Sequence, residues 1–522
     1  MKASRILLLF WPTLLWFLGY LEYFTQVYWG APSLRMSGIS VFVSILILIC
    51  CLFFQLKAIR SFIDELLDSL ASESKIINLL LWALIGVQFL IFFVSALESR
   101  SPPHLPQEND AINYHYALVK QHLLHGSFHH INWFSADLWP MPIQYGIGPF
   151  WFLDTVYHKI PSFLFSLWIF AMMLGFGLHL SKKKRDLWYL PALIFFTTHG
   201  VVIQLGIAML DLPILYFLTA SIYSLFILKN KYLWLGALHL AVFASAKAIS
   251  PLQTGAVLFV FGIFVLTRKK IDKKFFRLPK KEMVKFFALT FLFFSVLFAR
   301  SFWVSMHRAG TPLFPFATCI FSVEGCNGPQ GEIIKDSAKQ QLADKNTYGD
   351  GNGPIAFLRH LYLVSVPLKG VNNRYDYPAG FGWLVLMLLF LMRIFTRVPD
   401  DRYRVLLYIS LSFWVVWWIG SHQTRWLYPV MLFGLLSSID LLSKVKPQIL
   451  VSVLLISATL SLASHYRSFA PTLCEPADII EHQQKSKIKL DPRTKNIITE
   501  ETLYVDEPLY DHAPTRRYWI LR

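Results

Sequence analysis

Two carboxylates in a long polar segment, Glu108 and Asp110, have the residue types and spacing that could do chemistry. Such a pair could take a proton from an acceptor hydroxyl or amine, or hold a divalent cation against a phosphate or diphosphate. Tyr114 and His115 follow closely enough to contact a phosphate there. Alternatively, Asp110 only complements a helix dipole, Glu108 is a solvated loop acid, and the aromatic pair anchors the helix at a membrane surface. Four further histidines could bind a metal, although interfacial histidines without a fixed partner are commoner: His122, His125, His129 and His130.

Charged residues at the ends of apolar segments form a second group of candidates. Asp211 lies between two apolar segments, where a carboxylate is costly in a bilayer and is by default a functional candidate. Lys247 could neutralise a phosphate, and Arg300, Arg308 and Arg425 lie at the ends of other apolar segments. The alternatives are that Asp211 caps the following helix, that Lys247 reaches out to water, and that the arginines pair with loop acids.

The composition predicts the kind of structure that positions these residues. The chain has 522 residues, of which 55% are hydrophobic and 16% charged, and its mean hydropathy is +0.47. These values predict an all-α polytopic membrane protein. The formal net charge of +17 arises from short Lys and Arg clusters between apolar segments. The positive-inside rule accounts for such clusters, so we expect no nucleic-acid partner.

Apolar segments of roughly 17 to 22 residues, each near the length that crosses a bilayer as a helix, recur along the chain. About thirteen transmembrane helices are predicted. They cover residues 6–28, 39–56, 76–97, 160–180, 187–208, 212–228, 232–249, 251–267, 284–303, 381–396, 405–420, 426–442 and 448–463.

With a cytoplasmic N-terminus, thirteen crossings place the basic clusters between the spans on the cytoplasmic side. The long polar segments then face outward. This topology divides the chain into three N-terminal spans (1–97), a first outer loop (98–159), spans four to nine (160–303), a second outer loop (304–380), spans ten to thirteen (381–463) and an outward-facing C-terminal tail (464–522).

The two outer loops have different patterns. In the first, the apolar residues of 110–125 recur at helical spacing, which predicts a helix along the membrane surface. Residues 143–158 are aromatic-rich, and we expect them to pack at the interface in a segment broken by Pro149. The second loop is rich in Gly, Asn and Pro, which is typical of a flexible cover over a site or of a partner-binding surface.

Five short motifs occur in an order that resembles bacterial GT-C glycosyltransferases, the superfamily that includes protein O-mannosyltransferases and the aminoarabinose transferase of lipid A. The first-loop motif is Asp110-Ala-Ile-Asn-Tyr114-His115 with its preceding acid. The others are Met209-Leu210-Asp211, Ala246-Lys247, Gly310-Thr311-Pro312-Leu313-Phe314-Pro315 and Gln423-Thr424-Arg425-Trp426-Leu427-Tyr428-Pro429. The resemblance spans roughly residues 98–435 and implies a GT-C-like membrane fold.

By this resemblance, the chain is a glycosyltransferase of the bacterial cytoplasmic (inner) membrane that acts at the outer, periplasmic face. The donor would be a polyprenyl-phosphate sugar, and inversion at the sugar carbon is implied. Asp110 would activate the acceptor, with Glu108 as its partner or as a ligand of a divalent cation. The donor phosphate or substrate would contact the remaining candidates, namely Tyr114, His115, Asp211, Lys247, Arg300, Arg308 and Arg425. The sugar, the acceptor (lipid, glycan or protein) and any need for a metal cofactor stay open.

Two other classes of function fit a polytopic chain. A transporter or lipid flippase would use Asp211, Lys247 and Arg425 as coupling or substrate charges and would favour charges near mid-membrane. A noncatalytic scaffold would bind partners through its outer loop and tail.

The five cysteines contain no metal-ligand CxxC pair, so they define no zinc site. Cys319 and Cys326 lie in the second outer loop, where an oxidising compartment would allow a disulfide that closes a small loop. Cys474 is the alternative partner.

Overall fold

The structure is a computed structural model of the chain. It describes residues 3–29, 39–71, 74–100, 115, 119, 122, 138–139, 141–153, 157–181, 187–228, 232–266, 280–343, 348–349, 351, 353–365, 378–398, 401–442 and 444–474. These residues form 19 α-helices and no β-strand, as predicted for an all-α protein. Glu108, Asp110, Tyr114 and most of the predicted surface helix lie outside the described residues, although the described His115, Val119 and His122 have helical backbone.

The helices of the N-terminal half overlap the predicted spans, except for one helix in the first outer loop, Pro142–Leu153. They are α1 (Ala3–Leu9), α2 (Trp11–Trp29), α3 (Ile39–Ala71), α4 (Lys75–Glu98), α6 (Pro142–Leu153), α7 (Ile160–Leu180), α8 (Leu190–Phe196), α9 (His199–Leu205), α10 (Asp211–Tyr223), which continues as the π-helix η5 (Ser224–Leu228), and α11 (Leu233–Ala244). The first and fifth predicted spans are therefore each divided into two helices.

The C-terminal half adds further helices and two short 3-10 turns. They are α12 (Ser250–Leu266), α13 (Lys280–Ala309), η8 (Glu324–Cys326), α14 (Gly328–Ala343), α15 (Pro354–Leu363), α17 (Phe381–Ile394), α18 (Asp401–Ile419), η10 (Thr424–Leu427), α19 (Tyr428–Leu436), α20 (Ile439–Leu442) and α21 (Pro447–Cys474). The twelfth predicted span is divided between η10, α19 and α20. The last helix runs beyond the predicted boundary at residue 463, and the rest of the tail lies outside the described residues.

Six helices in the described part of the chain are long and apolar enough to cross a membrane. They cover Ile39–Asp68, Lys75–Glu98, Ile160–Leu180, Asp211–Leu228, Lys281–Ala309 and Pro447–Ser464. Shorter apolar helices include Leu233–Ala244, Ser250–Phe264 and Phe381–Ile394. The long apolar helices indicate a multi-pass membrane protein. The count of about thirteen crossings stays a prediction.

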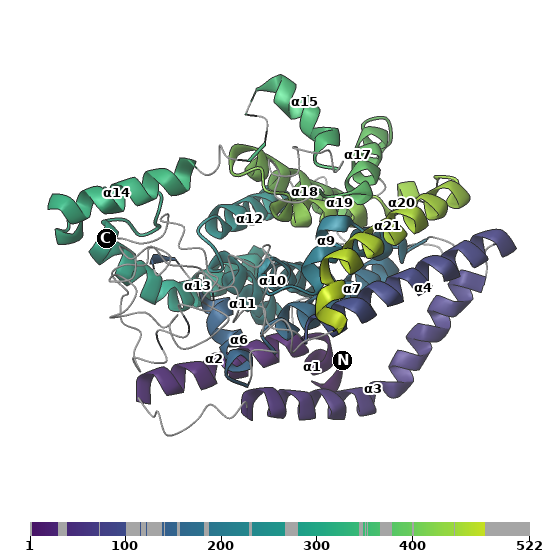
Figure 1. Cartoon of the computed structure of the whole chain (residues 1–522), viewed down its shortest axis with the longest axis horizontal. Helices are drawn as coiled ribbons and strands as arrows, with labels where there is room; N and C mark the ends of the chain where they lie inside the picture. The colour runs from purple at the N-terminus through teal and green to yellow at the C-terminus, as the bar shows by residue number, and fades with distance from the viewer. Residues whose placement is uncertain are drawn as a thin grey trace.

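Helices α7, α10 and α11 lie in the middle of the bundle, whereas α3, α4 and α13 lie toward its edges (Figure 1). All residues of α10 are buried. The edge helices instead expose large apolar side chains such as Phe53, Leu79 and Phe291. Exposed apolar surface of this kind suits contact with lipid.

The break between α8 and α9 has a local cause. The hydroxyls of Thr197 and Thr198 both donate to the carbonyl of Ile194, at 3.1 and 2.8 Å, and this back-bonding bends helices. Two distant side chains satisfy backbone groups at the break. Ser461 donates to the Thr197 carbonyl at 3.1 Å, and Tyr428 donates to the Gly200 carbonyl at 2.8 Å.

Helix α6 differs from the prediction because it runs through Pro149 without ending there. It packs against α2, where Gly146 meets the side chain and carbonyl of Trp16. The Trp16 indole also donates to the Pro142 carbonyl at 2.9 Å. A side chain at position 146 would collide with α2, so glycine permits this close approach.

The second outer loop contains helices that the sequence did not indicate. Helix α13 ends in a turn closed by a disulfide between Cys319 and Cys326, whose Cα atoms lie 5.6 Å apart, so this predicted pairing is present in the structure. Helices α14 and α15 follow, and Figure 1 shows them projecting from the bundle. Ile334 and Ala338 of α14 pack with Leu138 of the first outer loop, which joins the two outer loops in one small apolar cluster.

Candidate functional site

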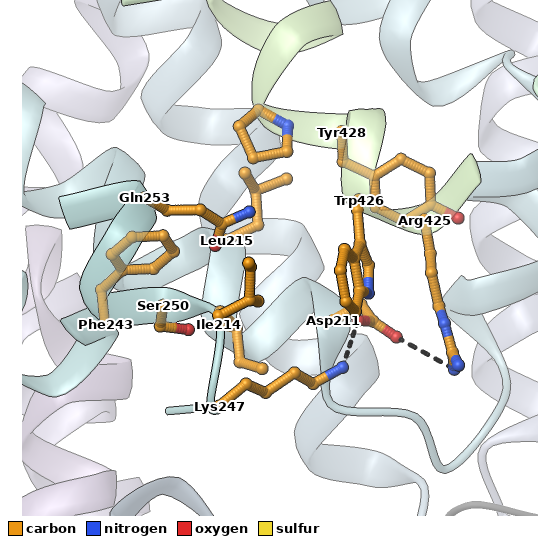
Figure 2. A pocket seen from close by; sticks show the side chains of 12 residues that line it. Asp211, Ile214, Leu215, Phe243, Lys247, Ser250, Gln253, Arg425, Trp426 and Tyr428 are labelled. Atoms are coloured by element: carbon orange, nitrogen blue, oxygen red, sulfur yellow. Dashed lines mark hydrogen bonds and ion pairs between the residues drawn. The ribbon is translucent and has the colours of Figure 1, made fainter. Parts of the chain in front are cut away.

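Three of the predicted site residues meet at one place. The ammonium of Lys247 donates to Oδ1 of Asp211 at 2.7 Å, and Nη1 of Arg425 lies 3.8 Å from Asp211 Oδ2. Figure 2 shows Lys247 and Arg425 approaching the carboxylate from opposite sides. In these two ion pairs, two cations share one buried carboxylate, and such cations can also bind an anionic ligand.

Each of these residues lies where a helix begins or ends. Asp211 is the first residue of α10, Lys247 lies in the turn between α11 and α12, and Arg425 lies in η10 between α18 and α19. A proline follows in the first turn of α10, α12 and α19, where its missing N–H removes no intrahelical hydrogen bond. The local sequence therefore explains why these helices begin beside the three charges.

The three residues border a small pocket with a cavity volume of about 30 Å³. This volume is far below the roughly 300–1,000 Å³ typical of small-molecule sites, so a ligand larger than a few water molecules would occupy it only in part. Most of the wall is apolar or aromatic. The lining residues are Asp211, Ile214, Leu215, Phe243, Lys247, Ile249, Ser250, Gln253, Arg425, Trp426, Tyr428 and Pro429. Because the N-termini of α10, α12 and α19 all contribute to the wall, the positive ends of three helix dipoles face the pocket.

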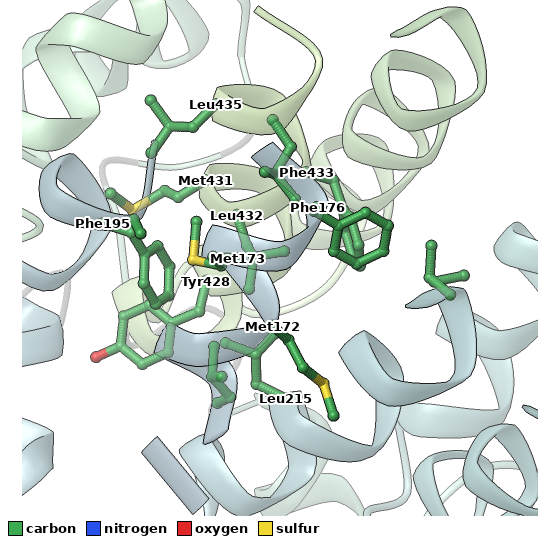
Figure 3. Close-up of a cluster of buried hydrophobic side chains, with 14 of the residues drawn as sticks. Met172, Met173, Phe176, Phe195, Leu215, Tyr428, Met431, Leu432, Phe433 and Leu435 are labelled. Atoms are coloured by element: carbon green, nitrogen blue, oxygen red, sulfur yellow. The ribbon is translucent and has the colours of Figure 1, made fainter. Parts of the chain in front are cut away.

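The inner wall of the pocket is continuous with the central core. Leu215 and Tyr428 line the pocket and also belong to the buried cluster in Figure 3. In that cluster they lie with Met172 and Met173 of α7 and Leu432 of α19. The starts of α10 and α19 therefore border the same pocket and belong to the same buried cluster.

An aromatic cluster around α18 positions Arg425. The Arg425 Nε donates to Gln423 Oε1 at 2.8 Å, and the Trp417 indole donates to the Gln423 carbonyl at 2.8 Å. Nearby, the Trp414 indole donates to His360 Nε2 at 3.1 Å, which requires a neutral acceptor nitrogen. Burial lowers the pKa of His360 to about 4, and burial also lowers the pKa of His422.

A second buried ion pair supports the segment before Asp211, and sequence reasoning missed it. Glu98 ends α4 and pairs with Lys159, which precedes α7, at 2.6 Å with both side chains fully buried. A Cβ at Gly206 would lie 3.0 Å from Glu98 Cγ, so the loop that leads to Asp211 packs directly on this pair. The only sequence signal was that both charges lie beside the ends of predicted spans.

His115 belongs to the first outer loop. Its side chain is buried, and its Nδ1 lies 2.9 Å from Gln144 Nε2. His115 is five residues from Asp110 in the sequence. The predicted roles of Asp110, Glu108 and Tyr114 stay predictions, because these residues lie outside the described part of the chain.

Arg300 and Arg308 do not line the pocket. Nη2 of Arg300 lies 3.0 Å from His122 Nε2, and its Nη1 donates to the Tyr145 hydroxyl at 3.4 Å. This contact holds the first outer loop against α13. Arg308 is exposed near the end of α13. The phosphate contacts predicted for both arginines stay predictions.

No group of three or more His, Cys, Asp or Glu side chains that could hold a metal occurs among the described residues. The predicted ligands of a divalent cation, Glu108 and Asp110, lie outside them.

Comparison with known proteins identifies no relative. No protein-family model matches the chain, and neither a curated protein nor a solved structure matches it.

Proposed function

We propose that the chain is a membrane glycosyltransferase that transfers a sugar from a polyprenyl-phosphate-linked donor to an acceptor at the outer face of the bacterial cytoplasmic membrane. The observation that carries the proposal is the pocket at which Lys247 and Arg425 flank Asp211 beside three helix N-termini. An apolar wall next to two cations and three helix N-termini suits a ligand that is a lipid at one end and a phosphate at the other. The ordered motifs that resemble GT-C glycosyltransferases support the same class.

In the proposed reaction, Asp110 takes the proton from an acceptor hydroxyl as its oxygen attacks the anomeric carbon of the donor. The new carbon–oxygen bond forms while the bond from that carbon to the phosphate oxygen breaks. The polyprenyl phosphate leaves with the electron pair. Lys247 and Arg425 stabilise the negative charge that develops on it, which is where fixed positive charge lowers a barrier most. His115, which is buried beside Gln144, would keep the Asp110 segment close to the bundle.

The topology is part of the proposal. About thirteen crossings with a cytoplasmic N-terminus would put the first outer loop, the disulfide-closed turn and the C-terminal tail outside. A disulfide between Cys319 and Cys326 supports an oxidising compartment for this turn, because such bonds rarely persist in the cytoplasm.

Transfer from a radiolabelled polyprenyl-phosphate sugar, assayed in membranes, tests the proposal. We expect Asp110→Asn and Lys247→Gln each to lower the transfer rate by roughly 100-fold or more, the size typical of a lost catalytic charge or donor. Lys339→Gln is a matched control, because Lys339 is exposed and pairs only weakly with Asp336. Full transfer by Asp110→Asn and Lys247→Gln at normal expression would refute the proposed roles.

Transport of a lipid-linked anion is a second candidate. The division of predicted spans into α8 and α9, and into α19 and α20, is the observation in its favour, since transporters often bind ions at discontinuous helices. Reconstituted vesicles distinguish the two functions. A transporter moves the labelled lipid between leaflets without forming a new glycosidic bond, whereas a transferase forms labelled product from an added acceptor.

A further inference from the structure

Three polar atoms of the pocket have no hydrogen-bond partner among the described residues. They are Oδ2 of Asp211, Oγ of Ser250 and Nε1 of Trp426. Asp211 and Ser250 are 8% and 1% exposed, and all three atoms are buried although their residues line the pocket. A buried polar group without a hydrogen-bond partner is destabilising, so a ligand that satisfies all three groups would be selected.

The chemistry of the three atoms specifies what they require. The indole nitrogen of Trp426 can only donate, so it needs an acceptor such as a phosphate oxygen. The Ser250 hydroxyl can also donate to an anion, and it stands at the first residue of α12, where the helix dipole favours negative charge. The ionised Asp211 carboxylate can only accept. Its Oδ1 is bonded to Lys247, whereas Oδ2 makes only the 3.8 Å ion pair with Arg425 and can still accept a hydrogen bond from a donor such as a sugar hydroxyl.

We infer that Asp211, Ser250 and Trp426 are specificity-determining residues for a sugar phosphate: Ser250 and Trp426 contact the phosphate, and Asp211 Oδ2 accepts from a sugar hydroxyl. This inference rests on the proposed function and assigns roles within its site. A phosphate without a sugar would leave Asp211 Oδ2 without a hydrogen-bond donor. A sugar without a phosphate would leave the Trp426 N–H without an anionic acceptor.

Asp211 therefore has the opposite effect on ligand recognition from Lys247 and Arg425. The cations Lys247 and Arg425 attract any phosphate, whereas Asp211 repels an anion and accepts from a hydroxyl. Replacing Asp211 by Asn removes the repulsion and replaces one acceptor oxygen by a donor. The change should weaken the preference for the sugar without weakening phosphate binding, a pattern that a general loss of structure would not produce.

Binding to the full-length protein in detergent micelles tests the inference with four probes: dodecyl phosphate, a dodecyl phosphohexose, hexose 1-phosphate and inorganic phosphate. We expect the wild-type protein to bind the phosphohexose lipid at least 10-fold more tightly than dodecyl phosphate. Ser250→Ala and Trp426→Phe should each weaken both lipids by roughly 5- to 10-fold, the effect of one lost hydrogen bond. Asp211→Asn should reduce the preference to below 3-fold while dodecyl phosphate binds at least as tightly as before.

Ser245→Ala is the matched control, because the Ser245 hydroxyl bonds to the Ala241 carbonyl of its own helix at 2.7 Å and does not line the pocket. Unchanged binding by Ser250→Ala and Trp426→Phe, or a full sugar preference in Asp211→Asn, would overturn the inference. Tighter binding of the lipid than of hexose 1-phosphate identifies a lipid-linked source, and equal binding identifies a soluble sugar phosphate. Binding does not require turnover. If these binding results were obtained but no sugar transfer were detected, the glycosyltransferase proposal would be refuted and the binding inference would stand.

Discussion

Two acid–lysine pairs of almost equal length lie in this helical bundle in different surroundings. Glu98 and Lys159 are 2.6 Å apart with both side chains fully buried. Asp211 and Lys247 are 2.7 Å apart, but Lys247 is 20% exposed, a second cation approaches the carboxylate, and a pocket borders both residues. Neither residue of the first pair lines the pocket. In the second pair the carboxylate is shared by two cations, and its Oδ2 makes no hydrogen bond beside the pocket.

We therefore assign a structural role to the Glu98–Lys159 pair and a ligand-binding role to the Asp211–Lys247 pair. Glu98 stands at the C-terminus of α4 and Lys159 before the N-terminus of α7, so both charges oppose the helix dipoles. A buried pair is weak evidence for stability in itself. Its contact with Gly206 explains its position, because it fixes the loop that carries Asp211 to the pocket. Ser162 adds to this support by donating to the Met209 carbonyl at 2.6 Å.

The largest effect on thermal stability is expected when the Glu98–Lys159 pair is broken. Glu98→Gln would remove the buried carboxylate with which Lys159 pairs, and loss of one partner of such a pair costs about 3–5 kcal/mol. We expect a large drop in the thermal unfolding midpoint in detergent, with recovery in the double variant Glu98→Gln/Lys159→Met. Asp211→Asn is the comparison, and it should lower the midpoint much less because Lys247 can reach solvent. A larger drop for Asp211→Asn than for Glu98→Gln would reverse the assignment of the two pairs.

A smaller effect is expected from the histidines that support Arg425. Burial lowers the pKa of His360 to about 4, from an ordinary value of 6.5. Between these values the unfolded chain binds a proton that the folded protein excludes, so the free energy of unfolding should fall as the pH is lowered from 6.5 to 4. His422 acts in the same direction.

His360→Phe should flatten this part of the pH profile of the unfolding midpoint. An unchanged slope would mean that other groups set the pH dependence. Binding of dodecyl phosphate over the same range shows whether the aromatic cluster holds Arg425 in place, because loosening Gln423 should weaken binding before the protein unfolds.

Sequence patterns indicated the helices well because apolar runs of membrane length are a local property. Every predicted span coincides with described helical residues. The patterns did not indicate the division of the fifth span, because the Thr197–Thr198 break depends on the backbone bonds that these side chains make. Helices α14 and α15 were missed because their Gly- and Asn-rich surroundings are typical of a flexible loop.

Part of the site was predicted because its signal is also a local property of the sequence. Asp211, Lys247 and Arg425 were identifiable because charges at the ends of apolar segments are unusual. The Glu98–Lys159 pair was not, since its partners are 61 residues apart and each alone resembles an ordinary loop charge. Ser250 and Trp426 could not be found from sequence because an unsatisfied hydrogen-bonding atom is defined only by the packing around it.

Photolabelling tests the central claim most directly. A dodecyl phosphate with a diazirine on its first carbons should label the pocket wall, at peptides that contain Phe243, Ile249 or Leu215. Excess unlabelled dodecyl phosphohexose should abolish this labelling, and the double variant Lys247→Gln/Arg425→Gln should lose it. Labelling confined to the exposed faces of α3 and α13, equal in the wild-type protein and the variant, would contradict a phosphate site between Asp211, Lys247 and Arg425.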